Sequence, residues 1–113
     1  MKLTDKEMEV MYVLWGSETP LSVTEIIAAS EDRTWKENSI FVMMNSLLVK
    51  GAVNVPHLKP TVTKAVRTYQ PTLSMEDMMA RQIYYKVKYN KAPDLNFDVE
   101  VFIEAIRKLM KDE

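Results

Sequence analysis

The chain has 113 residues and a net charge of −1, and its 47% hydrophobic and 27% charged residues are typical of one small packed domain. With no cysteine, one histidine and two glycines, it excludes disulfides, thiolate metal sites, a cysteine nucleophile and a glycine-rich phosphate loop. These exclusions lead us to expect no cofactor, no bound metal and no catalytic site. No stretch is long and apolar enough to span a bilayer and the first residues are not a secretory signal, so we expect a cytoplasmic protein.

Two capping boxes mark the starts of the first two helices that the sequence predicts. In Thr4–Glu7 and again in Ser22–Glu25, a hydroxyl can accept the backbone N–H three residues on, and the glutamate can accept an N–H in return. Apolar residues at helical spacing after each box predict helices over about 4–15 and from 22 to about 30. Two short helices joined by a turn are typical of a helix-turn-helix unit.

A third helix, predicted at about residues 36–50, has the most complete helical periodicity. Thr34–Glu37 offers a further capping box before it, and Gly51 can end it in the left-handed conformation. The pattern predicts that one side anchors this helix to the domain and leaves the reverse side free. The apolar residues at i, i+3, i+4, i+7 and i+8 are Ile40, Met43, Met44, Leu47 and Leu48.

After the third helix the period changes, and β-branched residues favour strands. Residues 52–55 and 65–69 predict two strands that flank a basic tip at 57–64. Three helices followed by such a hairpin have the order of a winged helix-turn-helix. We therefore expect a mainly α fold with a small β-hairpin, and we assign residues 1–72 to this domain.

Two further helices, one from about residue 74 and one over about 97–111, are predicted in the remaining segment, 73–113. Each has an apolar side, and so small a segment rarely buries two such sides without a partner. The first domain of the same chain is one possible partner and a second copy of the chain is the other, which we favour. The residues expected to form this dimerisation interface are Met75, Met78, Met79, Ile83, Val87, Phe102, Ile106, Leu109 and Met110.

Several motifs resemble those of one protein family. Residues 3–15, LTDKEMEVMYVLW, resemble the opening of the penicillinase repressor family (BlaI/MecI type). Thr-Trp at 34–35, Ser-Ile at 39–40 and residues 47–53 are similar to that family's recognition helix and its exit, and Tyr-Gln-Pro at 69–71 resembles its wing-closing motif.

The resemblance implies a homodimeric transcriptional repressor whose winged helix binds a palindromic operator in double-stranded DNA and whose C-terminal helices dimerise. In one branch of the family an inducing protease cuts within the dimerisation part, and Asn96-Phe97 matches the scissile pair of those members. Another branch carries a C-terminal cysteine motif that senses copper, which this chain lacks.

Charge and helix-turn-helix geometry single out the residues expected to contact DNA. Residues 33–72 hold six basic residues against one acidic, whereas residues 1–32 hold two against seven, so the middle of the chain suits a polyanion. In a helix-turn-helix, early residues of the second helix reach base edges, while hydroxyls and basic residues hold phosphates. The expected contacts are Thr34, Lys36, Asn38, Ser39, Phe41, Val42, Asn45, Lys50, Lys59 and Lys64.

The free side of the third helix departs from the family, whose members usually place polar or basic residues there. Phe41 and Val42 stand at two of these positions, and Val49 is a third apolar residue on the same side. Two interpretations stay open. These side chains meet thymine methyl groups in the major groove, or they pack on the wing or on a protein partner as part of an apolar docking face.

Overall fold

The structure, a computed structural model, describes residues 1–60, 65–89 and 96–112. The contacts between residues divide the chain into two units, Met1–Ile83 and Tyr84–Glu113.

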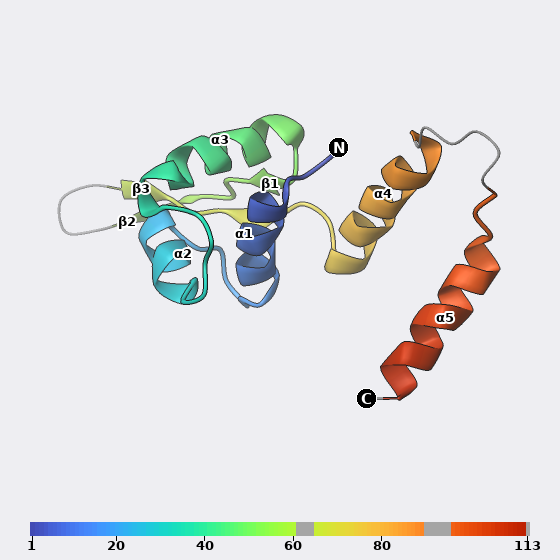
Figure 1. The fold of residues 1–113 in the computed structure, drawn as a ribbon. Helices are drawn as coiled ribbons and strands as arrows, with labels where there is room; N and C mark the ends of the chain where they lie inside the picture. The colour runs from blue at the N-terminus through green and yellow to red at the C-terminus, as the bar shows by residue number, and fades with distance from the viewer. Residues whose placement is uncertain (61–64, 90–95, 113) are drawn as a thin grey trace. The chain divides into compact units, whose positions relative to one another are not determined.

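The described elements follow the order predicted from the sequence: three helices, a set of short strands and two further helices (Figure 1). This confirms a mainly helical, winged helix-turn-helix fold. The helices are α1 (Asp5–Trp15), α2 (Val23–Ala29), α3 (Ile40–Lys50), α4 (Met75–Lys88) and α5 (Val99–Lys111). The strands are β1 (Val53–Asn54), β2 (Leu58–Pro60), β3 (Ala65–Arg67) and β4 (Gln70–Pro71).

Both predicted capping boxes are present at the starts of α1 and α2. The Thr4 hydroxyl accepts the Glu7 N–H at 3.1 Å, and the Glu7 carboxylate accepts the Thr4 N–H at 2.8 Å. The same pair of bonds joins Ser22 and Glu25, at 3.3 and 3.0 Å. Each box satisfies backbone donors that a helix start would otherwise leave unpaired, so the local sequence alone fixes where these two helices begin.

The capping box predicted at Thr34–Glu37 is wrong. A short 3₁₀ turn, Glu37–Ser39, leads into α3, and its cap residue makes no side-chain hydrogen bond to the helix. The Thr34 hydroxyl instead donates to the Glu9 carboxylate on α1, and the Trp35 side chain is buried in the core. These longer-range contacts set the path of the chain here. The other end of α3 is as predicted, since Gly51 ends it with a φ of 78°.

The core of the first unit lies between α1, α2, α3 and the strands, which are grouped together in Figure 1. The predicted apolar stripe of α3 faces it: Ile40, Met43, Met44 and Leu47 are buried, and Leu48 packs against the core. The other helices add buried residues to this core: Val10, Met11 and Leu14 of α1, Ile26 of α2 and Met78 of α4. The helical period of the sequence therefore predicted the inner side of α3 correctly.

The wing contains more strand pairing than the sequence predicted. β1 pairs with β4 and β2 with β3, both antiparallel, and Leu21 exchanges two backbone hydrogen bonds with Tyr69 at 3.0 and 2.8 Å. The expectation that residues 58–60 belong to the tip is wrong, because β2 contains them. Pro60 is the last residue of this strand, and proline is tolerated at the ends and edges of sheets because it has no N–H to donate.

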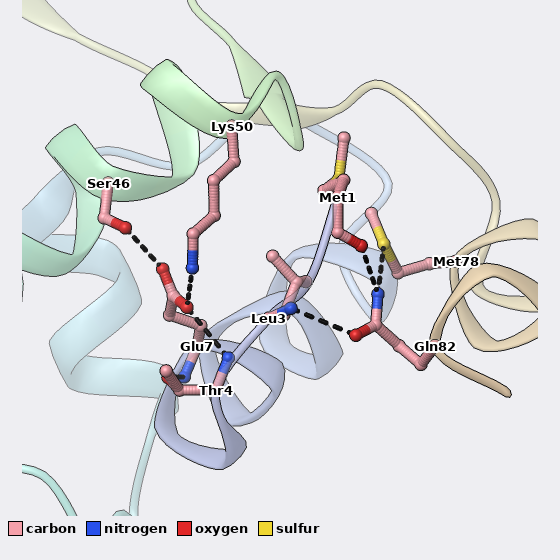
Figure 2. A network of polar contacts seen from close by, with 8 residues as sticks. All are labelled: Met1, Leu3, Thr4, Glu7, Ser46, Lys50, Met78 and Gln82. Atoms are coloured by element: carbon pink, nitrogen blue, oxygen red, sulfur yellow. Dashed lines mark hydrogen bonds and ion pairs between the residues drawn. The ribbon is translucent and has the colours of Figure 1, made fainter. Parts of the chain in front are cut away.

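A buried carboxylate ties α1 to α3 (Figure 2). Glu7 accepts the Lys50 ammonium at 2.6 Å and the Ser46 hydroxyl at 2.7 Å. Burial by itself raises the pKa of Glu7, but the Lys50 ammonium, the Thr4 N–H and the Ser46 hydroxyl stabilise the charged form and together bring the pKa below its ordinary value. The ion pair therefore holds the last turn of α3 against the start of α1.

The first half of α4 belongs to the first unit. Met78 is fully buried in its core, and the Gln82 side-chain amide bonds the Leu3 N–H at 3.0 Å and the Met1 carbonyl at 3.1 Å (Figure 2). The structural division consequently falls after Ile83, beyond the expected boundary between residues 72 and 73. The functional division at that earlier point stays a prediction.

The second unit contains the end of α4 and α5. The Asp98 carboxylate caps α5 by accepting the Val101 N–H at 3.1 Å, and α5 lies within the range predicted for the last helix. The Phe97 ring packs on the Phe102 ring with centroids 5.3 Å apart. The apolar side of α5 is strongly exposed, most of all at Leu109 and Met110.

The Glu7 site predicts an acid-dependent part of the stability. Because the pKa of Glu7 is lower in the folded state than in the unfolded chain, the stabilisation is complete above the unfolded pKa and is lost as the pH falls through the folded pKa. We expect Glu7→Gln to lower the free energy of unfolding by about 1–3 kcal/mol at pH 7, and this difference to shrink towards pH 3. Urea unfolding at both pH values measures it.

Glu18→Gln is the matched control, since Glu18 is an exposed carboxylate in the loop after α1. It should change the unfolding free energy by less than about 0.5 kcal/mol at either pH. An effect of Glu7→Gln that has the same size at pH 3 and pH 7 would contradict this role of the carboxylate.

Candidate nucleic-acid interface

The side of α3 opposite the core is exposed. Phe41 is 64% exposed, Val42 72% and Val49 89%, although all three are apolar. Asn38 and Asn45 are also exposed. Helical spacing places Phe41, Val42, Asn45 and Val49 on one side of α3, and Asn38 lies in the 3₁₀ turn directly before this helix. We call Asn38, Phe41, Val42, Asn45 and Val49 the outer face. The sequence predicted that this face is free, and the structure confirms it.

The outer face lies on the second helix of the helix-turn-helix formed by α2 and α3, which contact each other. In this motif the second helix lies in the major groove and its first residues reach the base edges. Phe41 and Val42 are in the first turn of α3, Asn45 is one turn further, and Val49 is near the end. Phe41, Val42 and Asn45 therefore have the placement that base contacts require, and Asn38 lies in the 3₁₀ turn just before them.

Two of the predicted phosphate-binding residues differ in their surroundings. Lys36 is exposed at the start of the 3₁₀ turn, where it can reach a phosphate. Thr34 donates both its hydroxyl and its N–H to the Glu9 carboxylate, and these bonds lower the pKa of Glu9. The Thr34 hydroxyl would have to leave Glu9 before it could donate to a phosphate oxygen.

The predicted role of Lys50 in phosphate binding meets a competing interaction. Its ammonium is 2.6 Å from the Glu7 carboxylate, and only 29% of its side chain is exposed. In this position Lys50 helps to hold α3 against α1, and a phosphate would have to compete with the buried Glu7 carboxylate for its ammonium group. This pair could not be predicted from the sequence, because the two residues are far apart along the chain.

The wing supplies one exposed cation that the sequence analysis did not single out. Arg67 on β3 is exposed and lines a cleft of about 750 Å³ together with Phe41 and Asn45 of α3 and the first residues of α2. The backbone of Lys59 pairs with Val66 in the wing, and Lys64 lies outside the described residues. The position of Arg67 in the basic segment was the available signal for including it.

Sequence comparison identifies the family. The sequence model of the family described as penicillinase repressor matches residues 3–112, nearly the whole chain. The chain belongs to the penicillinase repressor family. Its exposed recognition helix and wing are thus those of a DNA-binding transcriptional regulator, and such regulators are generally not enzymes.

The other comparisons concern curated protein sequences and solved structures. No curated protein sequence matches this penicillinase repressor family member. A structure of the Helicobacter pylori ferric uptake regulator Fur, described with three functional metal binding sites, is similar over 82% of this chain and 74% of that chain, with 21% sequence identity and a TM-score of 0.47. In the described part of the present chain, no three His, Cys, Asp or Glu residues are grouped so that they could hold a metal ion.

The residues expected to form the dimerisation interface are not equivalent. Met78 is 0% exposed in the core of its own chain, so its assignment to a surface that meets a second copy is corrected: it fixes α4 to the winged helix. Met75 and Met79 are exposed, and Ile83, Val87 and Phe102 are half-buried. The remaining three, all exposed on α5, are Ile106, Leu109 and Met110.

The predicted scissile pair of this penicillinase repressor family member, Asn96-Phe97, precedes α5 and is exposed. No helix among residues 1–60, 65–89 and 96–112 is long and apolar enough to cross a membrane.

Proposed function

We propose that the chain is a homodimeric repressor that binds a palindromic operator in duplex DNA. The observation that carries the proposal is the exposed outer face on the second helix of a helix-turn-helix, opposite a buried stripe that fixes its direction. Its first residues, from Asn38 to Asn45, contact base edges, with Ser39 at the border of this face. The protein has no catalytic role and acts in the cytoplasm without a cofactor.

Phosphate contacts come from both sides of the outer face. Lys36 stands before α3 and Arg67 on the wing, and both are exposed; Lys59 and Lys64 are the further phosphate contacts predicted from the sequence. Cations on two sides of a groove-binding helix set its register on the duplex, because they hold the sugar–phosphate backbones that border the groove. Thr34 and Lys50 join these contacts only if DNA releases them from Glu9 and Glu7.

The C-terminal helices, residues 73–113, join two copies. The apolar side of α5 is exposed in the single chain. A continuous apolar surface in contact with water is unfavourable and is typical of an interaction site. If a second copy covers this surface, the two recognition helices are related by a two-fold axis, and such a dimer binds two inverted half-sites. Cleavage at Asn96-Phe97 by an inducing protease would separate α5 from the rest of the chain.

A protein-docking winged helix is the second candidate, and the exposure of Phe41, Val42 and Val49 favours it. Apolar side chains are enriched in the centre of protein interfaces. This candidate predicts that the full chain selects no duplex from a random pool, even at low salt, so the DNA-binding experiment also decides between the two.

The central prediction is selection of a two-part site from a random duplex pool. We expect two inverted half-sites one or two helical turns apart, with affinity that falls steeply as salt rises from 50 to 200 mM, because lysine and arginine contacts release counterions from DNA. Fluorescence anisotropy on the selected duplex measures the salt dependence. Affinity that does not depend on salt, or no selected duplex, contradicts the proposal.

A second prediction concerns the dimer. Ile106→Asp places a charge in the middle of the apolar side of α5 and should convert the dimer to a monomer, as sedimentation velocity measures. It should also lower operator affinity, because a single half-site remains. Lys108→Asp, on the opposite side of the same helix, is the control and should leave the dimer intact. A dimer that survives Ile106→Asp would place the interface elsewhere.

A further inference from the structure

The outer face of α3 has an unusual chemical composition for a DNA-reading surface. Its five side chains are two amides and three apolar groups, and none carries a charge. The nearest lysine on the same helix, Lys50, is held by Glu7 at 2.6 Å. The cations lie instead at the borders, with Lys36 before the helix and Arg67 on the wing. The DNA that binds this surface has to offer uncharged hydrogen-bonding and apolar groups to its centre and phosphates to its borders.

The base pairs differ in what they offer such a surface. Guanine presents two acceptors in the major groove, which arginine or lysine reads best. Adenine presents an acceptor beside a donor, which an asparagine amide matches with two hydrogen bonds, and thymine presents a methyl group, which takes an apolar contact. An A·T pair therefore offers both chemistries of the outer face, whereas a G·C pair offers the partner of a cation that the face does not have.

We propose that the first turns of α3 read A·T pairs, with Phe41 and Val42 covering thymine 5-methyl groups and Asn45 bonding an adenine about two base-pair steps from the Phe41 contact. This rests on the proposed function and names the base chemistry of the same site. The helix rises about 1.5 Å per residue, so Phe41 and Asn45 are about 6 Å apart along it, which is close to two base-pair steps. Contact between a thymine methyl group and the side chain of Phe41 or Val42 removes apolar surface of both partners from water, which favours binding.

Val49 supplies an internal control for this proposal. It has the same side chain as Val42, the same face and a still larger exposed fraction, 89% against 72%. It lies about 10 Å further along the helix from Val42, away from the first turns that reach base edges. An apolar face that docks a protein would use both valines, whereas methyl reading in the major groove uses Val42 and leaves Val49 without effect.

The test removes single methyl groups from the DNA. The full chain first selects an operator from a random duplex pool. Each thymidine of one half-site is then replaced in turn by 2′-deoxyuridine, which lacks only the 5-methyl group, and affinity is measured at fixed salt. We expect one or two positions at which uracil weakens binding about fourfold, the factor that corresponds to one buried methyl-sized group.

The same series is repeated with Val42→Ala, Phe41→Ala and Val49→Ala. The uracil penalty at a sensitive position should disappear in Val42→Ala or Phe41→Ala and persist in Val49→Ala. All three side chains are exposed, so the three variants should unfold at the same temperature as the parent chain, and thermal denaturation checks this.

The outcomes distinguish a failure of DNA binding from a failure of methyl-group recognition. If the pool gives no duplex, the proposed function fails and this inference fails with it. If a two-part operator is found but its half-sites are G·C-rich, or no uracil weakens binding, or the penalty persists in both Phe41→Ala and Val42→Ala, the DNA-binding function stands and methyl reading is overturned.

Discussion

Everything that this chain presents to a ligand depends on the burial of one side of α3. Ile40, Met44 and Leu47 are almost completely removed from water against α1, α2 and the strands. Each buried side chain of this size stabilises the fold by about 1.5–3 kcal/mol, and a rotation of the helix would expose all of them together. The apolar outer face cannot therefore turn inward to escape water, because the inner side is more extensive and already fits the core.

The ion pair between α1 and α3 acts in the same direction. The Glu7 carboxylate receives Lys50, Ser46 and the Thr4 N–H in a buried place, so its charge is fully compensated. The bonds fix the rotation and the end of α3, since they require one particular side of its last turn. The arrangement also means that a phosphate would compete with Glu7 for Lys50, whereas Lys36 and Arg67 beside the outer face are exposed.

Features set by neighbouring residues could be predicted from the sequence. The boxes at Thr4 and Ser22, the left-handed Gly51 and the apolar stripe of α3 all follow from spacing over a few residues, and the structure confirms them. The fold order and the free outer face follow from the same signals, because a helix with one apolar stripe has one side to bury and one to leave in water.

Features set by distant residues could not be predicted in this way. The partners of Thr34 and Lys50 are carboxylates on α1, more than twenty residues away, and Met78 lies on the same stripe as residues that remain exposed. The pairing of β2 was hidden because its Lys-Pro sequence is not typical of a strand. The residue types of the outer face could be read from the sequence, but the structure was needed to show that their side chains are exposed and so available to a ligand.

The absence of cysteine from the chain allows the most direct test of the central claim, that the outer side of α3 is free in the protein and covered by DNA. Val42→Cys and Met44→Cys each introduce one thiol, on the outer and the inner side of the same turn. The account predicts fast thiol modification in Val42→Cys, strong slowing by operator DNA, and slow modification in Met44→Cys with or without DNA. Equal rates in the two variants, or no protection of the Val42→Cys thiol by bound operator, would contradict it.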